Sequence, residues 1–187
     1  MIVGSIKEDL SVEKRISITP ETAKNFINLG LKVVIENSYA VHIGITDKEY
    51  EANGVEIKKT SKEILDSCHL LTKVNCPTGS EILNIKDKTI LIGMFNSSKN
   101  QNQLKELIKK NINIFSLELL PRISRAQSMD VLSSQSNLAG YRSVIDSIYE
   151  FEKAIPMMMT AAGTVPAAVI IIGIAFSNSY TESTTDL

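Results

Sequence analysis

The chain has 187 residues, of which 20 are Lys or Arg and 21 are Asp or Glu, so its net charge at pH 7 is −1. Hydrophobic residues make up 43% of the sequence, a composition that excludes a disordered chain, a collagen-like chain and a disulfide-stapled mini-protein. The balanced charge also argues against a dedicated nucleic-acid-binding protein, which usually has a net basic face.

Short apolar runs in the first 117 residues predict buried parallel strands, because strands covered on both faces are continuously rich in Val, Ile and Leu. The predicted strands are Ile2–Ile6, Leu31–Ile35, Leu70–Val74, Thr89–Gly93 and Ile112–Leu117, with a weaker edge strand at Val55–Ile57. Amphipathic segments separate these runs. This alternation predicts an α/β fold with a doubly wound, flavodoxin-like parallel sheet.

The intervening helices have recognisable start and stop signals. Thr19 precedes Pro20, which places a capping residue before a proline at the first helical position, and Gly30 follows at the expected end. Three more helices begin with the Thr-x-x-Glu spacing of a capping box, at Thr46–Glu49, Thr60–Glu63 and Thr78–Glu81. Gln101–Lys109 has an apolar face and predicts a further helix.

The sequence changes character after the sixth strand. Apolar residues at helical spacing in Ser128–Glu152 predict one long helix, with a break at Ala139-Gly140 as the alternative. Residues 155–180 have no charged side chain and could cross a bilayer on length alone. Prolines and glycines interrupt this span, however, which favours a Pro/Gly loop followed by a buried strand at Val169–Ile172. The remaining residues form a polar tail.

A weak dinucleotide-binding signal follows this last predicted strand. Gly173 stands at the first glycine of the G-x-G-x-x-G fingerprint, but Ala175 and Asn178 replace the second and third. Those glycines allow the backbone to approach a pyrophosphate and the helix to pack on its strand. Only nine residues follow Asn178, whereas a first βαβ unit alone needs about 30 residues, so we expect that this chain cannot build that domain.

Polar residues follow the predicted strands at the edge where ligands bind in open parallel sheets. The polar ones are Lys7, Arg15, Lys73, Asn75, Asn96, Glu118, Arg122 and Arg125, and the apolar Met94 and Phe95 lie at the same edge. The cations would suit an anionic or carboxamide-bearing ligand. The alternative is that each is a solvated loop charge, as single charged residues mostly are.

The densest polar cluster lies at residues 121–135. On a helix, Gln127, Asp130 and Ser134 (or Ser133) share one face that offers donors and acceptors to a ribose or an amide. The alternative is a helix N-terminus with capping hydroxyls and an acidic first turn.

Other chemistries are not indicated. His42 and His69 have no carboxylate at ligand spacing, so we assign no metal site. Cys68 and Cys76 form neither a C-x-x-C motif nor a disulfide framework, which favours a reducing compartment. The N-terminus does not resemble a secretory signal.

Several segments resemble the alanine dehydrogenase/pyridine nucleotide transhydrogenase family. The most specific is PRISRAQSMD at Pro121–Asp130, which is followed by NLAGYR at Asn137–Arg142. Supporting matches are the Lys7-Glu8 turn, RISITP at Arg15–Pro20, LTKVNCP at Leu71–Pro77 and TAAGTVP at Thr160–Pro166. The resemblance runs from Met1 to Ile174.

The resemblance implies the N-terminal domain of a two-domain, Rossmann-type protein with NAD(H) in the cleft. We therefore expect a first α/β domain at residues 1–126, a linking helix at 127–155, and the opening strand of a truncated NAD-binding domain with a polar tail at 156–187. The transhydrogenase branch is the nearer match. In it, hydride passes between NAD(H) on one subunit and NADP(H) on a partner subunit, coupled to proton translocation by membrane subunits.

Motif matches imply the site residues. Arg122, Gln127, Asp130 and Ser133 would hold the nicotinamide and its ribose, Tyr141 would lie near the cleft, Gly173 would contact the cofactor, and Arg15 and Lys73 would face a ligand. No acid or base is assigned, because direct hydride transfer needs positioning. We expect weak or absent NAD(H) binding by these 187 residues, since the fingerprint is incomplete.

The resemblance also implies a homodimer that works with transhydrogenase membrane and NADP-binding subunits. Its expected location is the cytoplasm, or the cytoplasmic face of the inner membrane, where those partners would hold it. We expect neither direct membrane insertion nor nucleic-acid binding. An alanine dehydrogenase-like oxidoreductase is one alternative. It needs a histidine as acid and base, whereas Gly93–Asn96 contains none. A non-catalytic dimerisation or docking module is the other.

Overall fold

The structure, a computed structural model, describes residues 1–121, 123–150, 157–160 and 163–166, the last two ranges as backbone only. The chain divides into two compact units, Met1–Met129 and Asp130–Leu187. Arg122, Gly173, the predicted strand at Val169–Ile172 and the polar tail lie outside the described residues. The three-part domain division stays a prediction.

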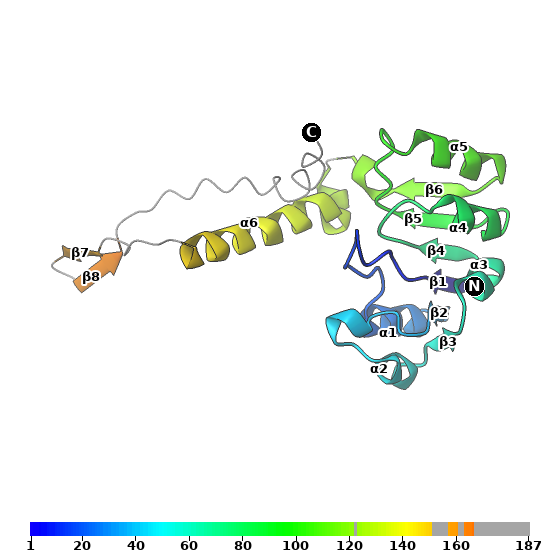
Figure 1. Ribbon diagram of the computed structural model, residues 1–187, viewed down its shortest axis with the longest axis horizontal. Helices are drawn as coiled ribbons and strands as arrows, with labels where there is room; N and C mark the ends of the chain where they lie inside the picture. The colour runs from blue at the N-terminus through cyan, green and yellow to red at the C-terminus, as the bar shows by residue number, and fades with distance from the viewer. Residues whose placement is uncertain (122, 151–156, 161–162, 167–187) are drawn as a thin grey trace. The chain divides into compact units, whose positions relative to one another are not determined.

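A six-stranded parallel sheet forms the centre of the first unit (Figure 1). Its strands are β1 (Ile2–Ser5), β2 (Lys32–Glu36), β3 (Glu56–Lys58), β4 (Leu70–Thr72), β5 (Ile90–Gly93) and β6 (Asn113–Ser116). Their order is β3-β2-β1-β4-β5-β6, and every neighbouring pair is parallel. The predicted doubly wound sheet is confirmed: without the edge strand β3, the order is the flavodoxin-like 2-1-3-4-5.

The helices of the first unit begin where the capping signals predict. They are α1 (Pro20–Asn28), α2 (Asp47–Ala52), α3 (Ser61–Ser67), α4 (Gly79–Asn84) and α5 (Gln101–Lys109), with short 3₁₀ helices η1 (Val41–Ile43), η2 (Leu117–Leu119) and η3 (Ser124–Met129). The Thr19 hydroxyl accepts a hydrogen bond from the Thr22 amide at 3.2 Å. Capping boxes are present at the starts of α2 and α4. Gly30, with φ of 79°, follows α1 as predicted.

Two hydrophobic cores cover the two faces of the sheet. Alternate strand residues point to opposite faces, so Val33 and Val34 enter different cores. The first core packs β1 and β2 against α1 and α2, and includes the fully buried Ala23 and Tyr50. The second packs β4 and β5 against α3, α4 and α5, and includes the fully buried Leu107. The rigid sheet between them fixes the positions of the loops at its carboxyl edge.

A buried hydroxyl network anchors the segment between β1 and α1 to the sheet. The Tyr39 hydroxyl lies 2.8 Å from the Ser5 hydroxyl and accepts from the Ser17 amide at 3.0 Å. The Ser17 hydroxyl also lies 3.0 Å from the Thr72 hydroxyl. Tyr39 and Ser5 are almost fully buried, so this network ties the chain after β1 to both β2 and β4.

We expect Tyr39→Phe to destabilise the first unit by about 1.5 kcal/mol, because the Ser17 amide and the Ser5 hydroxyl lose a buried partner. Urea unfolding followed by circular dichroism would measure this. Tyr50→Phe is the matched control: its hydroxyl donates to the Ile18 carbonyl at 2.8 Å, and we expect the smaller loss from this single bond. Equal stability of Tyr39→Phe and wild type would contradict the anchoring role.

The second unit contains α6 (Val131–Tyr149), β7 (Met157–Thr160) and β8 (Gly163–Pro166). The predicted long helix is confirmed in α6, which continues through Gly140 without a break. The expectation of a loop before the last strand is wrong for β7 and β8, which pair as an antiparallel hairpin. Four residues per strand are too few for a clear alternation, and the glycine and prolines concealed the strands. Among the described residues, no helix has both the length and the apolar character needed to cross a membrane.

Candidate functional site

The candidate site lies at the carboxyl ends of β1 and β4, where the strand order reverses. From β1 the chain continues outward to β2 and β3, and then returns to β4 on the other side of β1. Loops diverge at such a switch point and leave a crevice for ligands. The predicted residues Lys7 and Arg15 follow β1, and Lys73 follows β4 directly.

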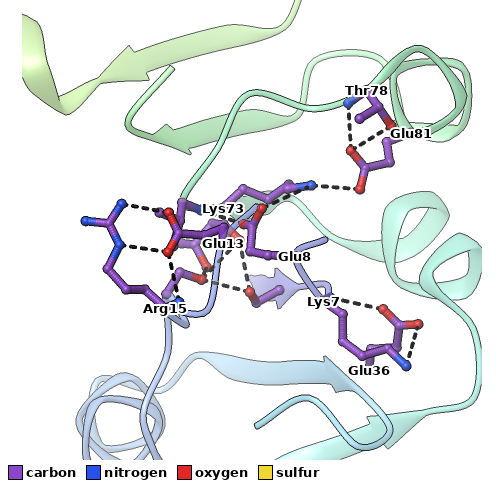
Figure 2. A network of polar contacts seen from close by, with 12 residues as sticks. Lys7, Glu8, Glu13, Arg15, Glu36, Lys73, Thr78 and Glu81 are labelled. Atoms are coloured by element: carbon purple, nitrogen blue, oxygen red, sulfur yellow. Dashed lines mark hydrogen bonds and ion pairs between the residues drawn. The ribbon is translucent and has the colours of Figure 1, made fainter. Parts of the chain in front are cut away.

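Lys73 lies at the centre of a buried charge cluster (Figure 2). Its side chain is 4% exposed, and its Nζ lies 2.7 Å from Glu81 Oε1 and 3.7 Å from Glu8 Oε2. Two carboxylates therefore share one ammonium group. Glu81 also accepts from the Thr78 amide at 2.7 Å, so the same side chain completes the capping box of α4 and holds Lys73.

Glu8 joins the loop after β1 to the loop after β4. Its Oε1 accepts from the Val74 amide at 2.7 Å, across 66 positions of sequence, while its Oε2 faces Lys73. Burial raises the pKa of Glu8 above its usual range, although Lys73 and backbone amides act in the opposite direction. The Glu8 carboxyl group thus ties the two loops together at the switch point. Lys73 and the backbone amides offset only part of the cost of burying its charged form.

Two more of the predicted cations, Arg15 and Lys7, are paired as well. Arg15 donates to both oxygens of Glu13, from Nε at 2.8 Å and from Nη2 at 2.7 Å. Burial opposes ionisation of Glu13, but the hydrogen bonds from Arg15 outweigh it and the pKa of Glu13 lies below its usual range. Lys7 Nζ lies 3.4 Å from Glu36. Lys7, Arg15 and Lys73 therefore each face a carboxylate and add no excess positive charge to this edge.

On the β5 and β6 side, Glu118 organises the loop that contains the predicted residues Phe95 and Asn96. Its carboxylate accepts from the Phe95 and Ser97 amides, each at 3.2 Å, and from the Ser116 hydroxyl at 2.6 Å. These hydrogen bonds lower the pKa of Glu118 despite its partial burial. Asn96 has a positive φ of 44°, so this loop is held in a specific, bent conformation.

The described residues of the 121–135 cluster do not lie on one helix, because η3 ends at Met129 and α6 begins at Val131. Gln127 lies in η3, and Asp130 is the N-cap of α6. The predicted shared face of Gln127, Asp130 and Ser134 is therefore wrong, and the helix N-terminus alternative is correct for Asp130. Its carboxylate accepts from the Ser133 amide at 2.9 Å and from the Ser133 hydroxyl at 2.6 Å. An Asp side chain competes with the backbone for amide hydrogens and so starts a helix more readily than it continues one.

The remaining predicted residues are less constrained. Tyr141 lies on α6 with 71% of its surface exposed, and its role near the cleft stays a prediction. His69 accepts from the Ile2 amide at the amino end of β4, away from the site, and His42 lies 2.7 Å from the Lys14 carbonyl. Within the described residues, no group of three or more His, Cys, Asp or Glu could hold a metal ion. Burial raises the pKa of Cys76 to about 11, so it is a neutral thiol.

Sequence reasoning missed the carboxylates that pair with the cations. These are Glu8, Glu13, Glu36 and Glu81. The sequence marked Glu81 as a capping residue of a helix, but not as a partner of Lys73. A usable signal existed for Glu13, which lies two positions from Arg15. The Glu8–Lys73 pair depends on the register of the sheet, which places the ends of β1 and β4 together.

A family model now adds to this geometry. The model of the alanine dehydrogenase/PNT N-terminal domain matches residues 4–139. The chain belongs to this family. The match covers nearly all of the six-stranded sheet and the beginning of α6, and it confirms the resemblance carried by PRISRAQSMD and by the segments before it.

Relatives place the chain on the transhydrogenase side of the family. It is 44% identical to an NAD(P) transhydrogenase alpha subunit of Rhodospirillum rubrum over 92% of this chain and 46% of that protein. It is 32% identical to an alanine dehydrogenase of Methanococcus maripaludis, over 92% and 47% of the two chains. The chain thus spans about half the length of the curated relatives it matches.

Solved structures agree with this assignment. A transhydrogenase from Sinorhizobium meliloti superposes with a TM-score of 0.79 at 40% identity, covering 90% of this chain and 50% of that one. An L-alanine dehydrogenase superposes with a TM-score of 0.70 at 22% identity, which supports the shared fold alone. Within the family, alanine dehydrogenases are therefore the more distant relatives.

Proposed function

We propose that this chain supplies the first domain of the NAD(H)-binding alpha subunit of a proton-translocating transhydrogenase. Hydride would pass from NADH on this subunit to NADP⁺ on a partner subunit, while membrane subunits translocate a proton. The observation that carries the proposal is the 44% identity to a transhydrogenase alpha subunit across 92% of the chain. The doubly wound sheet, with its polar switch point, gives this relationship a structural basis.

The proposed cofactor residues are Arg122, Gln127, Asp130, Ser133 and Gly173, with Tyr141 near the cleft. Asp130 and Ser133 form a preorganised pair in which both carboxylate oxygens are already oriented by hydrogen bonds. A carboxylate oxygen can accept more than one hydrogen bond, so the pair remains suited to a ribose hydroxyl. Direct hydride transfer requires this kind of positioning and no proton-transfer group.

Binding by the 187 residues alone should be weak. The fingerprint glycines are incomplete at Ala175 and Asn178, and the pyrophosphate of a dinucleotide normally rests on that turn and the helix that follows it. Arg15 and Lys73, the other possible ligand contacts, already face carboxylates. We therefore propose that NAD(H) affinity depends on a second domain that completes the cleft.

A joined chain tests this function. In this joined chain, residues 1–166 replace the matching half of the Rhodospirillum rubrum subunit. The joined chain would be assayed together with the transhydrogenase membrane subunits, using an NAD analogue whose reduced form absorbs at a different wavelength from NADPH. We expect hydride transfer, with a loss of at least about tenfold in Asp130→Ala. Ser136→Ala, on the same helix but outside the assigned set, is the matched control.

Two results would contradict the proposal. One is a folded joined chain that binds NADH but transfers no hydride to the NADP-binding subunit. The other is alanine-dependent reduction of NAD⁺, which would favour the alanine dehydrogenase alternative. In keeping with the function, we propose that the protein acts as a homodimer and is held at the cytoplasmic face of the membrane by its partner subunits.

A further inference from the structure

Glu118 joins two loops at the carboxyl edge of the sheet. It lies in η2, directly after β6, and its Oε2 accepts from the Phe95 amide at 3.2 Å. Its Oε1 accepts from the Ser97 amide at 3.2 Å and from the Ser116 hydroxyl at 2.6 Å. The two bonds from amides span 23 and 21 positions of sequence. The carboxylate therefore ties the loop after β5 to the turn that follows β6.

These partners require a carboxylate at position 118. All three are donors, two amides and one hydroxyl, and they are shared between both oxygens. An ionised carboxylate only accepts hydrogen bonds, whereas glutamine has one accepting oxygen and one donating NH₂ group. Glutamine here would direct its NH₂ group at a donor and leave at least one amide without this partner. Glu49, in contrast, accepts from the amide and hydroxyl of Thr46 within its own helical turn.

The loop after β5 is held in an unusual conformation between these bonds. Asn96, with φ of 44°, lies between the two amides that donate to Glu118. Phe95 is fully buried, and its carbonyl accepts from the Asn100 side chain at 2.8 Å. A left-handed residue persists where its surroundings fix it from both sides. The loop after β5 is thus a rigid support for the chain that leaves β6.

The turn anchored by Glu118 leads directly to Gln127. Pro121 restricts the backbone between them, and the Ala126 amide donates to the Ile123 carbonyl at 2.9 Å. Ala126 is itself buried, which fixes the far end of this path in the first unit. Gln127 follows it in η3 of the same unit. The position of Gln127 therefore depends on where Glu118 holds the start of the path.

From these contacts we infer that Glu118 is a positioning residue for nicotinamide recognition, because it holds the path to Gln127 against the loop after β5 and so sets where the Gln127 amide meets the cofactor. Glu118 acts through this path and not by contact with the cofactor. The inference rests on the proposed function for the identity of the ligand. Loss of an accepting oxygen at position 118 should therefore loosen η3 and weaken NADH binding together.

Limited trypsin digestion of the 187-residue chain tests the positioning without any cofactor. Arg125 lies in η3 and is exposed. We expect Glu118→Gln to speed cleavage after Arg125 by about tenfold, because proteolysis follows the population of the opened segment. Glu49→Gln is the matched control, since it also removes an acceptor of a backbone amide and a hydroxyl. Its cleavage after Arg125 should stay within about twofold of wild type.

Ser116→Ala covers the case in which Glu118→Gln does not fold. It removes one of the three hydrogen bonds and keeps the carboxylate, so we expect cleavage after Arg125 to rise by about threefold. Unchanged cleavage in Glu118→Gln would overturn the inference. If that variant does not fold, unchanged cleavage in Ser116→Ala would overturn it instead.

NADH binding by the joined chain tests the link to the cofactor. We expect Glu118→Gln to raise the Kd for NADH by about tenfold, and Glu49→Gln to leave it within about twofold of the unsubstituted joined chain. Equal effects of the two variants on the Kd would overturn the inference. Faster cleavage with unchanged NADH affinity would also overturn it, since Glu118 would then serve stability alone.

Failure of the proposed function is a separate result. In that case the unsubstituted joined chain would transfer no hydride, whereas the trypsin comparison needs neither NADH nor a partner subunit.

Discussion

Gly93→Ala should destabilise the first unit by about 3 kcal/mol, in the upper range for overpacking a rigid site. A Cβ at this position would overlap the Lys73 carbonyl oxygen and lie 2.5 Å from a ring carbon of the fully buried Phe95. Neither neighbour can move easily. The Lys73 amide donates to the Ile92 carbonyl at 3.1 Å, and the Met94 amide donates to the Val74 carbonyl at 3.0 Å, so the two strands are locked side by side.

Urea unfolding measures this loss. At an m-value of about 2 kcal/mol/M, the midpoint should fall by about 1.5 M. Gly79→Ala is the matched control in the same unit, because a Cβ there meets no atom within 4 Å and Gly79 is the first residue of α4. We expect its midpoint to stay level or rise. A Gly93→Ala protein with a wild-type midpoint would show that β4 and β5 separate more readily than their hydrogen bonds indicate.

Lys73→Met should cost about 3 kcal/mol near neutral pH, because it leaves two carboxylates without their shared cation. Glu8 suffers most: its side chain is only 6% exposed, whereas that of Glu81 is 19% exposed and keeps the Thr78 amide as a partner. Methionine has nearly the length of lysine, so the loss would reflect charge more than cavity formation. Thermal and urea unfolding would both detect it.

The pH dependence of this variant distinguishes charge from packing. Burial already raises the pKa of Glu8 in the folded chain, and loss of Lys73 should raise it further. A carboxyl group with a higher pKa in the folded state binds more protons when folded, so stability falls as pH rises from the unfolded value through the folded one. The deficit of Lys73→Met should therefore be smaller near pH 5 than near pH 7.

The double variant Glu8→Gln/Lys73→Met supplies the control. It removes the uncompensated charge and should recover a large part of the loss, while its remaining deficit should depend less on pH. A Lys73→Met deficit that is the same at both pH values, or that persists fully in the double variant, would contradict the charge explanation. It would assign the role of Lys73 to packing by its aliphatic stem.

The sheet could be predicted because each strand carries a local signal. Buried parallel strands are apolar on both faces, and the capping residues at Thr46, Thr60 and Thr78 act within one helical turn. The predicted bounds lie within about two residues of the structure for most strands, which is the usual uncertainty of element ends. The hairpin of β7 and β8 had no such signal, since each strand is short and glycine and prolines lie in or beside it.

The position of the candidate site could be predicted from the sequence, but the contacts between its side chains could not. Strand order placed Arg15 and Lys73 at the correct edge, because the carboxyl ends of parallel strands share one side of the sheet. Their pairing with Glu13, Glu8 and Glu81 could not follow from periodicity, since a salt bridge such as Glu8–Lys73 joins residues 65 positions apart. The role of Asp130 was also left open. Its spacing from Gln127 suggested one helix, but its carboxylate accepts from a backbone amide and caps α6 instead of extending η3.

The paired charges have a consequence for the function. Lys73 and Arg15 form ion pairs with carboxylates. These two cations therefore hold the loops of the switch point in place and offer little free positive charge to a cofactor phosphate. Recognition of the nicotinamide and ribose would then depend on the Pro121–Asp130 segment and Ser133, and recognition of the pyrophosphate on a second domain. The first domain alone would be a preorganised half of a cleft.

An NADH titration, followed by nicotinamide fluorescence, tests this central claim most directly. We expect the 187-residue chain, shown to be folded by circular dichroism, to give no saturable binding below about 1 mM, and the joined chain to bind and to lose affinity in Gln127→Ala and Asp130→Ala. Saturable submillimolar binding by the 187 residues alone would contradict the claim, because these residues would then form a complete cofactor site.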